Sequence, residues 1–142
     1  MQKDRLDVKN LEVYCHTRGG KKDIVKDVSF SLESGESLAI VGESGCGKTM
    51  TAMSLFQLLP AGCFSGGEAL LNGCNLLDCK NIKQLRGTEI VLIPQSGAEF
   101  LDPIFKIRYQ IFETLRKAGV PKKDWNKTAR ELLSLAGFAS PE

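Results

Sequence analysis

Long apolar runs are missing from this chain of 142 residues, and no leader sequence is expected. Its uninterrupted apolar stretches are only a few residues long, such as Val91–Ile93, whereas a membrane-spanning helix needs about 20 apolar residues. The first ten residues carry five charged side chains with no apolar stretch behind them, so no signal peptide is expected. The sequence therefore predicts a cytosolic protein.

An excess of one charge is missing as well. Lys and Arg total 19 against 17 Asp and Glu, which gives a formal net charge of +2 at pH 7. A protein that binds nucleic acid through its charge shows a clustered basic excess. The two basic pairs, Lys21–Lys22 and Lys122–Lys123, are interpreted as solvated surface. No nucleic-acid partner is expected.

Closely spaced metal ligands are also lacking. The chain has five cysteines and one histidine, His16, and no two cysteines have the C-x-x-C spacing. A structural zinc site needs such pairs, so it is rejected. A disulfide framework is not expected in a cytosolic chain. Four cysteines are therefore interpreted as separate thiols, and Cys46 is treated below.

The hydrophobic content of 42% is enough for a folded core. Alternating apolar residues predict half-buried strands, short continuous apolar runs predict strands buried on both faces, and Asn72–Gly73 predicts a hairpin turn. The predicted strands are 8–14 (at a sheet edge), 25–32, 38–41 and 89–93, with loops at 18–23 and 95–106, and the predicted helices are 48–59, 78–86, 108–118 and 122–136.

Residues Gly42–Thr49 read GESGCGKT, which is the Walker A pattern G-x-x-x-x-G-K-[ST]. A predicted buried strand precedes this loop and a predicted helix follows it. Backbone N–H groups of such a loop can surround a phosphate, and the helix N-terminus favours an anion. Lys48 would reach the β- and γ-phosphates, and Thr49 would offer its hydroxyl to Mg²⁺. The predicted ATP-binding residues here are Gly42, Glu43, Ser44, Gly45, Cys46, Gly47, Lys48, Thr49 and Met50.

Cys46 lies inside this loop. Nearby N–H donors and Lys48 would make its thiol reactive, but the favoured interpretation is that this position accepts any small residue.

Two segments carry a family resemblance. VSFSLESGESLAIVGESGCGKTMTAMSLFQLLP, residues Val28–Pro60, resembles the ATP-binding subunits of ABC transporters, with Cys46 where the family has Ser. VLIPQSGAEFLDPIFKI, residues Val91–Ile107, resembles the Q-loop of that family. It looks like the version in the nickel and oligopeptide/dipeptide importer branch, although Ser96–Gly97 replaces the usual Asn/Asp-Pro. The resemblance covers nearly the whole chain.

The resemblance implies an α/β fold, a P-loop NTPase of the ABC ATPase type, with an N-terminal antiparallel β-subdomain and the start of a helical subdomain. It implies that Gln95 contacts Mg²⁺ and the attacking water, and that an aromatic residue near the first loop stacks on adenine. Tyr14 is the nearest candidate, packing of Tyr14 on the sheet is an equal alternative, and His16 is a second candidate. The implied partners are a second ATP-binding subunit, membrane permease subunits and, indirectly, a solute-binding protein. The implied location of this chain is cytoplasmic, peripheral on the inner face of the cell membrane.

Three motifs of the family are not found after the Q-loop: the signature, a Walker B strand ending in Asp-Glu, and the switch histidine. Phe64–Glu68, FSGGE, resembles the signature but precedes the Q-loop and is interpreted as a structural turn. The resemblance therefore predicts that residues 1–142 are the N-terminal part of a nucleotide-binding domain, with an incomplete core. Without the catalytic Glu this part is expected to be inactive alone in ATP hydrolysis.

The sequence thus predicts the ATP-binding component of an importer for peptide or nickel. The alternatives are a non-transporting ABC ATPase of repair or translation, a P-loop kinase, and a non-catalytic nucleotide-binding remnant. Basic clusters for nucleic acid are not seen, and residues 108–142 hold only scattered arginines where a kinase would need an Arg-rich lid. The transported substrate cannot be read from these residues.

Overall fold

A computed structural model describes residues 4–97 and 101–139 of the chain. The chain divides into two compact units, Met1–Lys83 and Gln84–Glu142, and each unit is described by itself. Residues 98–100, which belong to the predicted Q-loop segment, lie outside the described part.

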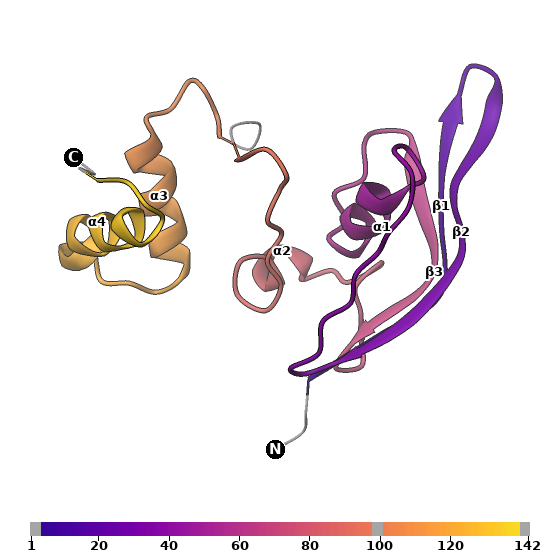
Figure 1. Ribbon diagram of the computed structural model, residues 1–142, viewed down its shortest axis with the longest axis horizontal. Helices are drawn as coiled ribbons and strands as arrows, with labels where there is room; N and C mark the ends of the chain where they lie inside the picture. The colour runs from indigo at the N-terminus through magenta and orange to yellow at the C-terminus, as the bar shows by residue number, and fades with distance from the viewer. Residues whose placement is uncertain (1–3, 98–100, 140–142) are drawn as a thin grey trace. The chain divides into compact units, whose positions relative to one another are not determined.

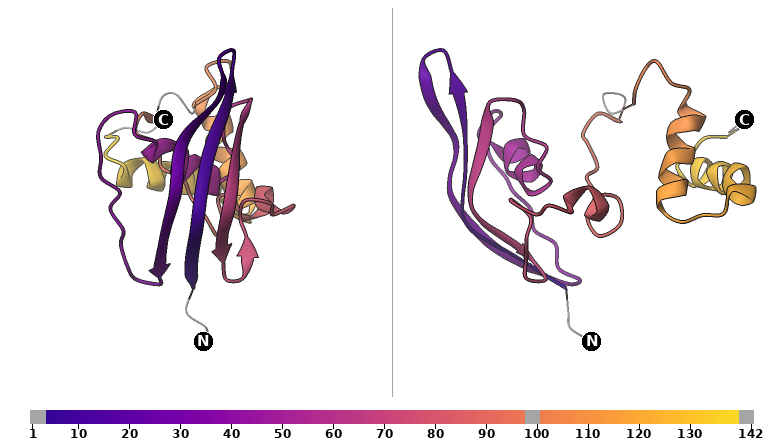
Figure 2. Two further views of the ribbon diagram at one scale, coloured as in Figure 1. Left: turned by 90° about the vertical axis from the view of Figure 1, so that its right-hand side faces the viewer. Right: turned by 180° about the vertical axis from the view of Figure 1, so that it is seen from behind.

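The first unit is built on an antiparallel sheet with strand order β2-β1-β3-β4 (Figures 1 and 2). The strands are β1 (Arg5–Thr17), β2 (Gly20–Glu33), β3 (Cys63–Leu71) and β4 (Cys74–Asn75). The prediction of an N-terminal antiparallel subdomain thus agrees with the structure. The prediction that 8–14 is an edge strand is wrong, because β1 pairs with β2 on one side and with β3 on the other.

Tight turns connect β1 to β2 and β3 to β4. Thr17 pairs with Gly20, so β1 and β2 are joined by two residues, and the loop predicted at 18–23 is mostly strand. Leu71 pairs with Cys74, which confirms the hairpin turn predicted at Asn72–Gly73. Both turn residues have positive φ, 50° and 85°, as the type I′ turn that matches strand twist requires.

The segment 64–68 lies inside β3, so its interpretation as a turn is wrong. Its glycines make room for an irregularity in β1, where the register shifts between Lys9 and Glu12. Gly67 has φ +91°, and a Cβ added there would lie 2.3 Å from the carbonyl oxygen of Asn10. Only glycine allows the two backbones to approach this closely.

The core of the first unit lies between the sheet and helix α1 (Lys48–Leu55), which contacts β1, β2 and β3 (Figure 1). Its most buried apolar residues are Val8, Leu11, Val13, Val25, Ala69, Leu76 and Ile82. From α1 the buried residues are Thr51 and Ser54, whereas its Met and Leu side chains are only half-buried. The helix also ends earlier than predicted, because Gln57 takes φ +50° and Leu58 donates its N–H back to the Met53 carbonyl.

The two predicted buried strands are not strands. Residues 38–41 run without regular structure, with Leu38 47% and Val41 87% exposed. Residues 89–93 contain only an isolated bridge between Arg86 and Ile90, and Ile93 is 87% exposed. In the described part of the chain no strand pairs with either run. An apolar run forms a buried strand only where neighbouring strands complete its hydrogen bonds.

A disulfide joins Cys15 of β1 to Cys63 of β3. This corrects the prediction that four cysteines are separate thiols. The two residues lie directly opposite each other in the register of β1 and β3, and antiparallel partners are close enough for their sulfur atoms to bond. The remaining cysteines, Cys46, Cys74 and Cys79, are free.

The second unit is helical. Its helices are α3 (Ile107–Lys117) and α4 (Trp125–Leu135), with the 3₁₀ turn η2 (Lys122–Asp124) before α4. Both helices match the predicted ranges within a few residues. Leu115 and Ala129 are buried between them, and the rings of Phe112 and Trp125 lie 5.4 Å apart. The helix predicted at 78–86 is only the single turn α2 (Ile82–Leu85).

Candidate functional site

The glycine-rich loop predicted to hold phosphate leads directly into α1. Gly45 has φ +82° and Gly47 has φ +99°, conformations that residues with a Cβ rarely adopt. Gly47 is the N-cap of α1, and its carbonyl accepts the first helical hydrogen bond, from the Thr51 N–H at 2.8 Å. The first N–H groups of a helix have no partner within the helix, so those of α1 point toward the loop.

No side chain caps this helix end, and no acidic residue lies in its first turn. Asp, Ser, Thr and Asn are the side chains that can cap such N–H groups, whereas the N-cap of α1 is Gly47. The N-terminus of α1 instead keeps its donors and its positive dipole end for another acceptor. An anion in the loop would supply that acceptor.

Strand β2 supports the loop from behind. A Cβ on Gly47 would lie 3.0 Å from the Ile24 carbonyl oxygen and 3.0 Å from a methyl group of Val25. Gly47 is buried, whereas the preceding loop residues are exposed. The loop is therefore seated on the sheet at Gly47 and open to solvent at its tip.

Lys48 folds its side chain back over this loop. Its Nζ donates to the carbonyl oxygens of Gly42 at 2.8 Å and Glu43 at 2.7 Å, and lies 3.6 Å from Cys46 Sγ. The ammonium group therefore sits at the centre of the Walker A residues. Thr49, beside it, is exposed. Together they bring one full positive charge, one hydroxyl and the helix N-terminus to one loop.

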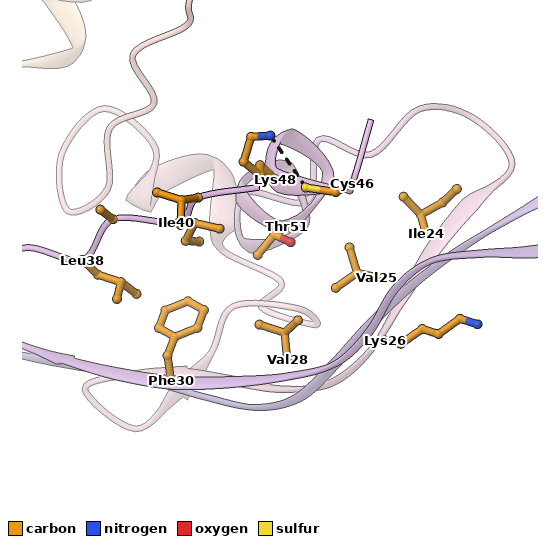
Figure 3. A pocket seen from close by; sticks show the side chains of 12 residues that line it. Ile24, Val25, Lys26, Val28, Phe30, Leu38, Ile40, Cys46, Lys48 and Thr51 are labelled. Atoms are coloured by element: carbon orange, nitrogen blue, oxygen red, sulfur yellow. Dashed lines mark hydrogen bonds between the residues drawn. The ribbon is translucent and has the colours of Figure 1, made fainter. Parts of the chain in front are cut away.

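A cavity of about 580 Å³ lies next to the loop, between β2 and residues 38–41 (Figure 3). Val28 and Phe30 of β2 face Leu38 and Ile40 across it. Its lining residues are Ile24, Val25, Lys26, Val28, Phe30, Leu38, Ala39, Ile40, Val41, Cys46, Lys48 and Thr51. The lining residues are mostly apolar, and Lys26, Cys46, Lys48 and Thr51 are the others.

Tyr14 lies in an aromatic cluster on β1 and β3. Its ring stacks on Phe64 with centroids 5.6 Å apart, and His16 meets both rings edge-on. Lys21 Nζ lies 4.3 Å from the Tyr14 ring centroid, within the range of a cation–π contact. The neighbouring Val13 is buried, and side chains alternate between the faces of a strand. Tyr14 therefore lies on the face opposite Val13, and its role toward adenine stays a prediction.

Gln95 is exposed and follows Pro94 in an irregular segment of the second unit. Thr49 belongs to the first unit, so the proximity of these two predicted Mg²⁺ ligands stays a prediction. The structure does bring together Lys48, Cys46 and the glycines of the loop.

Sequence reasoning missed the residues that seat the loop, Ile24 and Val25. Ile24 and Val25 lie shortly before Asp27, whose φ is positive (47°). The register between β1 and β2 also shifts between Val13 and Tyr14. The alternation at 25–32 placed Val28, Phe30 and Leu32 on one face and did not identify Val25 as part of it. The shift that brings Ile24 against Gly47 depends on strand register, which has no local signal in the sequence.

A Walker A sequence on a turn that opens a helix, with its lysine over the turn, defines the P-loop class of nucleotide-binding proteins. A model of the ABC transporter family matches residues 25–141. The chain belongs to this family, and it is therefore a P-loop NTPase in class. In the described part of the chain, no helix is both long enough and apolar enough to cross a membrane.

Individual relatives agree with this assignment. The oligopeptide transport ATP-binding protein OppD of Bacillus subtilis (strain 168) is 41% identical over 142 residues, which cover 96% of this chain and 40% of that protein. The dipeptide transport ATP-binding protein DppD of Lactococcus lactis subsp. cremoris (strain MG1363) is 43% identical, over 96% of this chain and 41% of that protein. The glutathione import ATP-binding protein GsiA of Pectobacterium atrosepticum is 36% identical, over 81% of this chain and 20% of that protein.

These similarities confirm the resemblance predicted from the Walker A and Q-loop segments. The chain spans about two fifths of the length of the first two relatives.

Proposed function

We propose that residues Gly42–Met50 bind ATP with Mg²⁺, and that the chain serves as the nucleotide-binding part of a peptide importer's ATP-binding subunit. One observation carries the proposal. The Lys48 ammonium lies over the loop at the uncapped N-terminus of α1, and no carboxylate lies in the first turn of that helix. A triphosphate would meet positive charge and N–H donors there, with no acid in the first turn of the helix.

Each loop residue has a part in this binding. Gly45 and Gly47 hold the positive-φ turn that lets the backbone approach the phosphates. Lys48 exchanges its two carbonyl acceptors for phosphate oxygens. Thr49 would offer its hydroxyl to Mg²⁺, and the metal would supply neutralisation of phosphate charge.

Two further residues complete the proposed site. Gln95 would contact Mg²⁺ and the attacking water, by resemblance to the Q-loop of the family. Tyr14 would contribute an aromatic surface near adenine, and its ring is stacked on the ring of Phe64. Both roles rest on the family resemblance.

Residues 1–142 contain a Walker A motif and a Q-loop but no signature, Walker B or switch histidine. Hydrolysis requires a catalytic Glu that polarises water, whereas nucleotide binding does not. Nucleotide binding is therefore the activity that we propose for residues 1–142 themselves. Hydrolysis would need groups that they do not contain.

The proposed cargo is peptide. The matched relatives are named as oligopeptide, dipeptide and glutathione transport proteins, which favours peptide over nickel. By the same reasoning, the proposed partners are a second ATP-binding subunit and membrane permease subunits, with a solute-binding protein acting indirectly. The proposed location is the inner face of the cell membrane.

Titration of a fluorescent ATP analogue with Mg²⁺ against Lys48→Ala tests the site. Loss of one charge-assisted contact should weaken binding roughly ten- to hundredfold. Lys26→Ala is the matched control, because Lys26 lines the same cavity but points away from it (Figure 3). Equal affinities for Lys48→Ala and the unmodified chain would reject the proposed site.

A further inference from the structure

Two of the three free cysteines lie next to each other. The Sγ atoms of Cys74 and Cys79 are 3.3 Å apart, and the Cys74 thiol donates a hydrogen bond to Cys79. A disulfide bond is about 2.0 Å long, so a movement of little more than an ångström would join them. The third free cysteine, Cys46, lies against Lys48 Nζ in the phosphate loop.

Hydrogen bonds hold the short segment that carries both thiols. Cys74 lies in β4, opposite Leu71. The Asn75 side-chain oxygen accepts from the Ala69 and Leu77 N–H groups at 3.1 and 3.3 Å, and the Leu76 N–H donates to the Ala69 carbonyl at 2.7 Å. These hydrogen bonds therefore attach the end of segment 74–77 that carries Cys74 to β3.

Gln57 holds the other side. Its Nε2 donates to the carbonyl oxygens of Leu76 at 2.8 Å and Cys79 at 3.1 Å. Leu76 between the two cysteines is buried, with 2% of its surface exposed. The proximity of the sulfur atoms thus follows from a backbone fixed at both ends.

We propose that Cys74 and Cys79 are a modification site: a dithiol that a small-molecule disulfide, such as oxidised glutathione, converts reversibly into an intramolecular disulfide. This inference does not depend on the proposed nucleotide binding. It differs from the bond between Cys15 and Cys63, because both thiols here are reduced and one is exposed.

The reaction has two exchange steps. Cys74, the exposed thiol, loses its proton and its thiolate attacks one sulfur of the small disulfide, which breaks that S–S bond and releases one small thiol. Cys79, half-buried behind it, then attacks the mixed disulfide at the Cys74 sulfur and releases the second small thiol. The protein loses two hydrogen atoms and the small disulfide gains them.

The surroundings of Cys74 affect the rate of thiol–disulfide exchange. Its pKa is raised above the ordinary value, first by the hydrogen bond with Cys79 and then by desolvation and by the nearby Cys79 and Asp78. Since the thiolate is the nucleophile, exchange should be faster at mildly alkaline pH than at neutral pH. The exposure of Cys74 gives the small disulfide access.

The test equilibrates the full chain with mixtures of reduced and oxidised glutathione, blocks free thiols with an alkylating agent and maps the peptides by mass spectrometry. We expect Cys74 and Cys79 to escape alkylation together, in one cross-linked species, and to become alkylated again after dithiothreitol treatment. Alkylation of both at every glutathione ratio would overturn the proposal, and so would separate glutathione adducts on each.

Two variants test the order of the steps. Cys79→Ser removes the resolving thiol, so a mixed disulfide of glutathione with Cys74 should accumulate. Cys46→Ser, the matched control, should leave the Cys74–Cys79 cross-link unchanged. A cross-link that disappears in Cys46→Ser, or a Cys79→Ser chain without the mixed disulfide, would contradict the assignment.

Discussion

The sheet of the first unit and the two apolar runs at 38–41 and 89–93 have similar residue types but different structures. Strands β1, β2 and β3 pair along most of their length, and Leu11 is 0% exposed. In the two runs, Val41 and Ile93 are each 87% exposed. Apolar sequence alone therefore does not bury a segment.

The difference lies in where the pairing partner comes from. β1 and β2 are joined by a two-residue turn, so these two strands pair with a neighbour in the sequence, and β3 adds to this hairpin from a more distant segment. Antiparallel neighbours can be connected this way, whereas strands buried in a parallel sheet need partners from distant segments. The comparison predicts that stability is concentrated in the sheet and that the apolar runs contribute little.

The largest expected effect is at Leu11. Leu11→Ala empties a fully buried site and should lower the free energy of unfolding by about 3 kcal/mol. Val41→Ala, a truncation in the exposed run of the same unit, should change it by less than about 0.5 kcal/mol. Urea unfolding followed by far-ultraviolet circular dichroism measures both. Equal losses in the two variants would remove the distinction between the sheet and the run.

The next effect separates two adjacent glycines of β3. Gly67→Ala places a methyl group against the Asn10 carbonyl at a positive φ and should cost about 2 kcal/mol. Gly66 has no atom within 4 Å of an added Cβ, so Gly66→Ala should stay within about 0.5 kcal/mol of the unmodified chain. Thermal unfolding of the pair gives the comparison. A Gly67→Ala chain as stable as Gly66→Ala would mean that the two backbones are not in close contact.

The smallest effect is at the start of β1. Arg5 donates to both carboxylate oxygens of Asp7, at 2.7 and 2.8 Å, and this hydrogen bonding lowers the pKa of Asp7 below its usual range. A lowered folded-state pKa adds stability above the unfolded-state pKa, and this stability is lost as pH falls through the folded-state value. The pair is exposed, so the contribution is small and weakened by salt.

Carboxyl titration by NMR measures this effect. Arg5→Gln should return the pKa of Asp7 toward its usual range. Arg18→Gln, which removes the same charge at the opposite hairpin end of β1, should leave it unchanged. An unaltered Asp7 titration in Arg5→Gln would show that the contact is absent in solution.

Local patterns in the sequence predicted much of the fold. The alternation of Val28, Phe30 and Leu32, the Asn72–Gly73 turn and the apolar faces of α3 and α4 all have local signals, and the structure contains them. The strand order, the irregularity of β1 opposite Gly67 and the Cys15–Cys63 disulfide depend on register between distant segments. No local pattern encodes that register.

The features of the candidate site likewise divide into those with a local sequence signal and those without one. The Walker A motif predicted the glycine-rich turn and the start of a helix at Lys48, and the segments Val28–Pro60 and Val91–Ile107 predicted the family to which the chain belongs. The seat of Gly47 on Ile24 and Val25 was not predicted, and neither was the stack of Tyr14 on Phe64. These contacts arise from strands that lie far apart in the sequence, so only the folded sheet reveals them.

Amide hydrogen exchange of the full chain with and without Mg-ATP tests the central claim, that the turn before α1 holds the triphosphate. Bound phosphate oxygens accept from these backbone N–H groups, so exchange should slow at Gly45–Thr49 when nucleotide is added, and Lys48→Ala should reduce the change. Unchanged exchange across Gly45–Thr49, with slowing confined to another segment, would contradict the account.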